Sequence, residues 1–390
     1  MSEPAAAEPT EIRKALATRK LILPVLLGVG AAAWLLWSGL DDVVTDPGTG
    51  EKTTTQALLQ NFEWTSRATW ALLGVFAFVV IRDVAYMVRL RVLSLGAFRW
   101  RQAFDSIMLW ELASALTPSI IGGSAVAILI LRREGMPVGR SVATVFVTAM
   151  MDELFYLTLV PLVFLVVAWQ GGAFFPTVDG LAVWGGAPVP VLFWAAYGLL
   201  AVLTGLIVLG VLAAPRWTRQ QVQRVVSWRG LRRWSGAAHR WADDMVTASD
   251  AMRGAGWRLW AKAMTATAAS WLARFLTLNM ILLIFMEAVP HAAVLARQLV
   301  MWVVLMISPT PGSAGFAEVA LPAFLGDVTG LGYLAIVAVV WRLATYFPYL
   351  FMGSVVLPGW LQKTKPPKKR HPKQIPLVST DDETLNHSAR

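Results

Sequence analysis

The stretch "MWVVLMISPTPGSAGFAEVAL", residues 301–321, decides how this chain folds. Its two ends are apolar enough to lie in a membrane, but prolines and glycines interrupt its centre. Proline lacks a backbone donor and disfavours helical geometry at the residue before it, so one straight helix cannot run through the stretch. We therefore expect two helices joined by a break, and the break residues are Pro309, Pro311, Gly312 and Gly315.

A second apolar stretch has the same form: "LWELASALTPSIIGGSAVAIL", residues 109–129. Here the break is expected at Pro118, Gly122 and Gly123. Unpaired backbone groups are costly in hydrocarbon, so such breaks persist only where protein buries them or where they line a wet cavity. The two stretches resemble each other loosely, which leaves an inverted repeat open.

Composition places both stretches in a membrane. The chain is 56% hydrophobic and has several runs of about twenty residues with almost no charge, as bilayer-spanning helices do. The sequence therefore predicts an all-α polytopic membrane protein. The chain has no cysteine, which excludes disulfides and thiolate metal sites.

Charge is distributed unevenly between the connecting segments. The segment 41–64 holds five acids and one lysine, and 170–190 holds no basic residue. Basic residues gather instead in 13–20, 89–101, 132–140, 216–258 and 363–373. By the positive-inside rule these basic segments are cytoplasmic. We expect the net charge of +10 to mark orientation and contact with anionic inner-leaflet headgroups rather than a nucleic-acid partner.

Keeping every basic segment inside fixes the number of crossings. Six are expected, with both termini cytoplasmic: 21–40, 68–88, 142–168, 191–213, 259–285 and 331–356. The apolar segments 105–131 and 292–325 are left over, and each must enter and leave from one face as a re-entrant hairpin. The two hairpins open to opposite faces, an arrangement that many transporters use to build a site near the midplane.

This placement divides the chain into three parts. We expect a cytoplasmic segment at 1–20, a transmembrane domain at 21–356 and a disordered basic cytoplasmic tail at 357–390. Within the domain, 214–258 is a basic, tryptophan-containing cytoplasmic insertion. It suits amphipathic helices on the inner leaflet, and a plain linker fits equally well. We expect the plasma (inner) membrane; the sequence leaves the oligomeric state open, with a homodimer as one option.

Ionisable residues at membrane depth are the candidate site, because each costs about 2.5–3.5 kcal/mol or more there. They are Arg342, Glu318, Arg274, Asp152, Glu153 and Glu111. In one interpretation the arginines bind the phosphate of a lipid headgroup. In the other, Arg274 and Arg342 pair permanently with Asp152, Glu153 or Glu318. Adjacent helical positions point about 100° apart, so we expect at least one of Asp152 and Glu153 to pair inside the bundle.

Three further features of the sequence suggest a structural or binding role. Glu318 follows the second break, where a carboxylate is favoured by the helix dipole; it either caps the helix or recognises a cationic headgroup. Backbone amides after each break, near 122–124 and 312–315, suit an anion. Arg82 falls near the end of its span, so we expect it to snorkel to the interface.

These residues resemble a known family. "SPTPGSAGFAEVALPAFL" (308–325) and "WRLATYFPYLFMGSVVLPG" (341–359) look like the C-terminal signature of the lysylphosphatidylglycerol synthase transmembrane-region family, also described as flippase-like. "TPSIIGGSAVAILILRREG" (117–135) and "MDELFYL" (151–157) resemble its N-terminal motifs. The chain departs from the pattern at Ser124 and Ala127, where the family often has an acid and an arginine.

The resemblance implies a protein that moves lipids between leaflets. Some members also carry a soluble aminoacyl-transfer domain, for which the 34 residues after Val356 leave no room. We therefore expect a translocase for an amino-, glyco- or isoprenoid-type lipid, with no enzyme activity, catalytic residue, cofactor or metal. The histidines fall outside the spans and no Gly-x-x-x-x-Gly-Lys motif occurs. An integral-membrane enzyme of lipid or envelope synthesis and a scaffold that uses 216–258 remain alternatives.

Overall fold

The structure is a computed structural model. It describes residues 26, 29, 30, 33, 34, 37, 43–45, 52–117, 119–176, 182–183, 187–227, 235–254, 256–306, 310–329 and 333–363. Most of the first expected span, 21–40, therefore lies outside the described residues, as do Pro118 and Pro309.

Long apolar helices dominate the described part of the chain, in which five segments could cross a membrane. These are α4 (Ser66–Leu93), α7 (Val138–Trp169), α8 (Val189–Ile207) with a π-helical turn (Val208–Ala213), α11 (Trp257–Phe285), and α14 (Leu334–Thr345) followed by α15 (Phe347–Lys363). They correspond to the five expected crossings after 21–40. Large apolar side chains such as Phe76 on α4 and Leu206 on α8 are exposed, as they are on a lipid-facing surface. The expected all-α, multi-pass membrane fold is confirmed.

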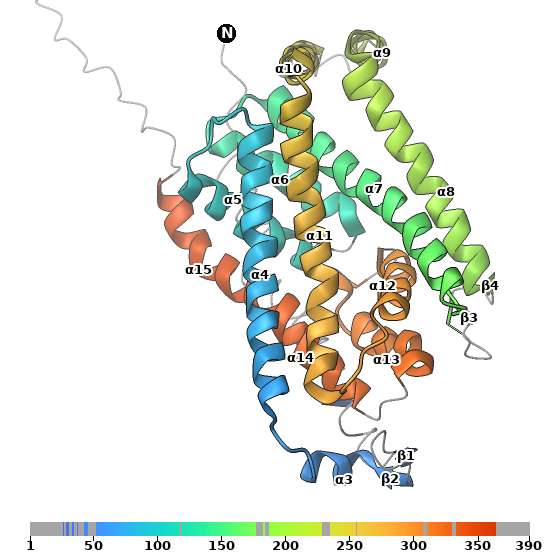
Figure 1. Ribbon diagram of the computed structural model, residues 1–390. Helices are drawn as coiled ribbons and strands as arrows, with labels where there is room; N and C mark the ends of the chain where they lie inside the picture. Colours follow the sequence, from blue (N-terminus) through green and yellow to red (C-terminus); the bar gives the residue numbers. More distant parts are fainter. Residues whose placement is uncertain are drawn as a thin grey trace, which may run out of the picture.

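Both expected re-entrant hairpins are present. The first consists of α5 (Trp100–Leu116) and α6 (Ser119–Arg133). The second consists of α12 (His291–Met306), a 3-10 turn (Pro311–Ser313) and α13 (Phe316–Thr329). Figure 1 shows the first hairpin toward the upper end of the molecule and the second toward the lower end, so the two enter from opposite sides.

The same order of elements occurs twice in opposite directions. In the first half, α4 runs upward in Figure 1 and is followed by a hairpin and by α7; in the second, α11 runs downward and is followed by a hairpin and by α14 and α15. The two leading helices, α4 and α11, lie side by side along their lengths. At Gly74 they come so close that an added Cβ would lie 2.9 Å from the sulfur of Met280. This is the arrangement of an inverted repeat.

Short elements connect the spans. At the upper end α9 (Pro215–Val226) and α10 (Ser235–Gly254) pack together, with Arg219 and Asp243 2.8 Å apart. At the lower end lie α3 (Thr55–Gln60) and the strand pair β1 (Val43–Thr45) and β2 (Lys52–Thr54). A second pair, β3 (Ala182–Val183) and β4 (Ala187–Pro188), precedes α8. The insertion 214–258 is thus helical over α9 and α10.

The boundary of the expected tail needs a correction. The sequence predicts a disordered segment at 357–390, but α15 continues to Lys363. Trp360 is almost fully buried and its indole donates to Glu134 at the end of the first hairpin, which holds the helix in place beyond Val356. Residues 364–390 lie outside the described part of the chain.

Proline inside α7 is accommodated by a neighbouring helix. Pro161 has no N–H to donate to the carbonyl of Leu157, one helical turn earlier. The hydroxyl of Tyr197 on α8 donates to that carbonyl at 2.7 Å. A freed backbone acceptor at membrane depth is therefore satisfied by protein, as hydrocarbon surroundings require.

A glycine allows α15 to lie directly against α5. At Gly353 an added Cβ would lie 2.5 Å from Cβ of Leu112 and 3.0 Å from the carbonyl oxygen of Met108. We expect Gly353→Ala to lower the free energy of unfolding by about 1–3 kcal/mol, because the two backbones must move apart. The matched control is Gly359→Ala in the same helix, where an added Cβ meets nothing within 4 Å. Thermal unfolding in detergent compares the two, and equal midpoints would contradict the close approach.

Candidate functional site

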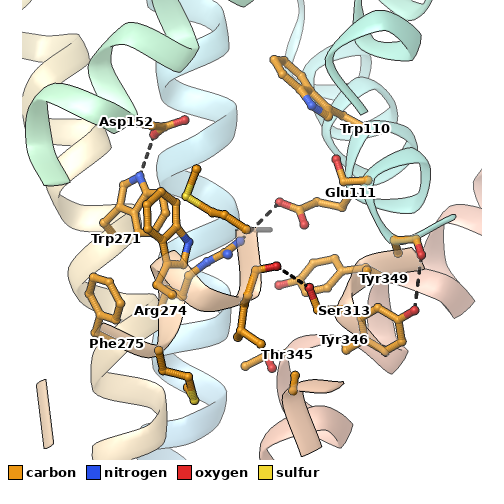
Figure 2. Close-up of a pocket in the computed structure, with 18 of the residues that line it drawn as sticks. Trp110, Glu111, Asp152, Trp271, Arg274, Phe275, Ser313, Thr345, Tyr346 and Tyr349 are labelled. Atoms are coloured by element: carbon orange, nitrogen blue, oxygen red, sulfur yellow. Dashed lines mark hydrogen bonds and ion pairs between the residues drawn. The ribbon is translucent and has the colours of Figure 1, made fainter. Parts of the chain in front are cut away.

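A cavity of about 380 Å³ lies where the two hairpins face each other. Residues of both hairpins, of α4, α7 and α11, and of the final span form its wall. Five of the six predicted ionisable residues line it, namely Glu111, Asp152, Glu153, Arg274 and Arg342. The broken helices therefore do surround a cavity, as their sequence predicts, and Figure 2 shows its charged and aromatic side chains.

The tip of the second hairpin is held by Arg342. Gly312 and Ser313 both have left-handed backbone geometry, with φ of 56° and 54°. The guanidinium of Arg342 donates to the Gly312 and Ser313 carbonyls at 3.2 and 3.0 Å, and the Ser313 hydroxyl donates to the Leu305 carbonyl at 2.9 Å. These three backbone acceptors at the break are thus bound by side chains of the protein.

Arg342 also forms an ion pair with Glu318. Its Nε donates to a carboxylate oxygen of Glu318 at 2.8 Å, and both side chains are buried. Glu318 lies in the first turn of α13, but no atom of it lines the cavity. For this pair the structure favours the second interpretation of the sequence: Arg342 and Glu318 stabilise the hairpin.

The tips of the two hairpins touch through Tyr346, the residue between α14 and α15. Its hydroxyl donates to the carbonyl of Ala115 at 3.3 Å, and its ring lies 2.6 Å from the position that a Cβ on Gly312 would occupy. A side chain at 312 would separate the tips, so glycine is required there for space as well as for φ. The backbone amides of Ser313 and Ala314 donate to Thr310 and Pro311, which leaves these two amides unavailable to an anion.

The first break is shorter than predicted. Thr117 is extended, as the residue before a proline tends to be, and α6 begins at Ser119. Gly122 and Gly123 lie inside α6 and are not part of the break, which corrects the prediction. At Gly123 an added Cβ would lie 2.4 Å from the hydroxyl of Ser114, so the glycine serves close contact between the two arms of the hairpin.

Asp152 and Glu153 have different surroundings. Arg89 on α4 contacts both carboxylate oxygens of Asp152, and the indole of Trp271 donates to it at 2.6 Å. Glu153 has one buried carboxylate oxygen without a hydrogen-bond partner. The expectation that at least one of the two acids pairs inside the bundle is confirmed for Asp152.

Glu111 binds an arginine that sequence reasoning placed elsewhere. Arg82 donates to Glu111 at 2.7 Å and its side chain is only 3% exposed, so the expectation that it snorkels to the interface is wrong. Its guanidinium lies 4.4 Å from the ring of Tyr349, whose hydroxyl donates to Asp83. Arg82 therefore sits in the core, where α4, α5 and α15 meet.

Arg274 lies on the cavity wall opposite Glu111 (Figure 2). The nearest approach of its guanidinium to the Glu111 carboxylate is 3.9 Å, too long for a hydrogen bond. Its side chain is 33% exposed, and its guanidinium lies 5.2 Å from the ring of Trp271. None of the partners expected for Arg274, namely Asp152, Glu153 and Glu318, forms an ion pair with it.

Sequence reasoning missed Arg82 and Arg89 as parts of the site. Both come late in α4: Arg82 lies just before the basic segment 89–101 and Arg89 is its first residue, a position typical of interfacial residues. The helix α4 continues to Leu93, beyond the end of the expected span 68–88, so Arg82 lies more than two turns inside it. Among the described residues, no three or more acidic or histidine side chains are grouped so as to hold a metal ion.

Comparison with known proteins places the chain in a family. A "UPF0104 membrane protein" of Archaeoglobus fulgidus is 24% identical over 308 residues, which cover 77% of this chain and 89% of the relative. No solved structure matches the chain. The model of one family, described as the lysylphosphatidylglycerol synthase TM region, matches residues 21–353. That match takes in both hairpins and the cavity between them, so the chain belongs to the family of the lysylphosphatidylglycerol synthase TM region.

Proposed function

We propose that this protein moves a polar lipid between the two leaflets of its membrane, without changing it chemically. The observation that carries the proposal is the charged cavity between two hairpins that enter from opposite sides. A headgroup must leave water to cross hydrocarbon, which is costly for charged and hydrogen-bonding groups. The cavity offers charged and polar partners on that path.

The dimensions of the cavity suit a headgroup. A volume of about 380 Å³ lies in the lower part of the range of small-molecule sites, so it accommodates a headgroup and excludes a whole lipid. The acyl chains would remain in the bilayer, against the apolar exterior of the bundle. The family supports a lipid as the ligand, because its description refers to the membrane region of a lipid-synthesising protein.

The inverted arrangement supports access from both sides. Each hairpin is anchored at its own end of the molecule and contributes one side of the cavity. A rocking motion of one half against the other would expose the cavity to each leaflet in turn, as in other transporters with inverted repeats. The described residues that join the two tips are Tyr346, Gly312 and Ala115.

Transbilayer movement of fluorescent lipids in proteoliposomes tests the proposal. Lipids labelled on an acyl chain and carrying different headgroups are placed in both leaflets, and a membrane-impermeant reductant then bleaches the outer leaflet. We expect the purified protein to let the reductant bleach more than half of the label for at least one polar headgroup. Protein-free vesicles and vesicles with an unrelated helical membrane protein are the controls.

Two results would contradict the proposal. One is a bleached fraction equal to that of protein-free vesicles for every headgroup, at a protein content confirmed by gel. The other is chemical conversion of a lipid by the purified protein, detected by mass spectrometry of the extracted lipids. Conversion would identify the protein as an integral-membrane enzyme.

A further inference from the structure

The four buried arginines in the described part of the chain each donate a hydrogen bond to a carboxylate. Arg82 binds Glu111, Arg89 binds Asp152, and Arg342 binds Glu318 and two carbonyls. Arg297 on α12 donates to both carboxylate oxygens of Asp327 at 3.2 and 2.7 Å and to the carbonyl of Ala173. Each of these guanidinium groups is therefore neutralised and positioned by the fold itself.

Arg274 differs from these four arginines because no carboxylate in the described part of the chain lies within hydrogen-bonding distance of it. Its Nε is buried and, like that of Arg82, has no hydrogen-bond partner. Its closest acid, Glu111, is 3.9 Å away and already accepts a 2.7 Å hydrogen bond from Arg82. A guanidinium has five N–H donors and stays charged at every physiological pH. Arg274 thus brings a positive charge with unused donors to the wall of the cavity.

The neighbours of Arg274 hold it in this position. The guanidinium lies against the ring of Trp271, and the indole of that tryptophan is fixed by its hydrogen bond to Asp152. Stacking on an aromatic face orients the planar fork without using its N–H groups. Figure 2 shows Arg274 reaching from α11 into the space between Asp152 and Glu111. The side chain is therefore preorganised to receive an oxyanion.

We propose that Arg274 binds a phosphate-type anion in this cavity, and that the anion is the phosphate of a lipid headgroup. This inference rests on the proposed function and names its substrate class: a lipid whose polar headgroup is attached through phosphate. Two parallel N–H groups of a guanidinium match two oxygens of a phosphate. The other ionisable groups of the wall are paired within the fold or, at Glu153, acidic, so Arg274 sets the selectivity for the anion.

Binding of short-chain lipids to the purified full-length protein tests this inference. The probes are dihexanoyl phosphatidylglycerol and a galactolipid with the same chains but no phosphate, each titrated by microscale thermophoresis. We expect Arg274→Gln to weaken binding of the phospholipid by about tenfold or more, as loss of a charge-assisted hydrogen bond does. Arg274→Lys keeps the charge but loses the fork, so an intermediate affinity is expected.

The matched control is Arg67→Gln. Arg67 is also on a spanning helix and its side chain is 36% exposed, but it contacts Leu283 and Glu287 at the lower end of the bundle, outside the cavity. We expect this variant to bind the phospholipid as the wild type does. Equal thermal midpoints for the variants show that a weaker affinity does not reflect unfolding.

Inorganic phosphate distinguishes the two sources of the anion. If the site takes a lipid, phosphate should displace dihexanoyl phosphatidylglycerol poorly. If inorganic phosphate competes for the site as effectively as the phospholipid itself, the proposal that a lipid headgroup occupies the site is overturned, although Arg274 remains an anion site. Unchanged phospholipid affinity in Arg274→Gln, or equally tight binding of the galactolipid, would overturn the inference. Lipid movement that persists in that case would leave the proposed function standing.

Discussion

Arg342→Met is expected to lower the free energy of unfolding by about 3–5 kcal/mol, because it leaves a buried carboxylate without its partner. Glu318 is fully buried and Arg342 supplies its ion pair. The same substitution removes the donors to the Gly312 and Ser313 carbonyls at the tip of the second hairpin. Unfolding in mixed detergent micelles, followed by circular dichroism, gives the difference.

A second substitution distinguishes the effect of the lost ion pair from general damage to core packing. The double variant Arg342→Met with Glu318→Gln removes the unpaired charge, so it should be more stable than Arg342→Met alone. Arg253→Met is the control: its ion pair with Asp250 at 3.8 Å is exposed on α10, and such pairs contribute less than about 1 kcal/mol. A double variant no more stable than the single one would contradict this account of the pair.

Arg82→Met is expected to affect both stability and ligand binding. Glu111 loses its closest cation, which lies 2.7 Å away, and Asp83 loses a cation at 3.8 Å. Removing one partner of a buried ion pair costs about 3–5 kcal/mol. The Glu111 carboxylate would then turn to Arg274, now 3.9 Å away, and would occupy the donors that we assign to the phosphate.

Two measurements check this prediction. Binding of dihexanoyl phosphatidylglycerol to Arg82→Met should fall, because Arg274 is no longer available to the ligand. Adding Glu111→Gln should restore it, since the competing carboxylate is then gone. Restored binding at a thermal midpoint still below that of the wild type would show that charge competition, and not unfolding, controls the site. If the double variant binds as poorly as the single one, Arg82 does not act through Glu111 and Arg274.

The fold follows from the sequence because its determinants are local. Breaks at prolines need no knowledge of distant residues: Thr117 has the extended geometry that a following proline imposes, and Gly312 has a positive φ that glycine allows. The distribution of basic residues then decides that each broken segment turns back. The glycines at 122 and 123 misled the prediction, because glycine marks close contact between helices as well as breaks, and only the position of Ser114 distinguishes the two.

The partners within the site could not be read from the sequence. Arg82 and Glu111 are 29 residues apart, and Arg89 and Asp152 are 63 apart. Whether they meet depends on the rotation of each helix, and one residue changes the direction of a side chain by about 100°. Sequence therefore identifies ionisable residues at membrane depth, whereas the structure shows that Arg342 donates a hydrogen bond to its acid and that Arg274 comes no closer than 3.9 Å to Glu111.

The final span, which is interrupted at Tyr346, packs against the hairpins of both repeats. Its first segment, α14, packs on α13 of the second hairpin, and its second segment, α15, packs on α5 of the first. Neither repeat is therefore a self-contained body, because the chain crosses from one to the other in the wall of the cavity. In the rocking motion that we propose, displacement of the repeats on that side would become torsion about the backbone bonds of Tyr346, whose φ of −127° and ψ of −58° depart from helix. The final span is thus interrupted at the point where the two hairpin tips meet.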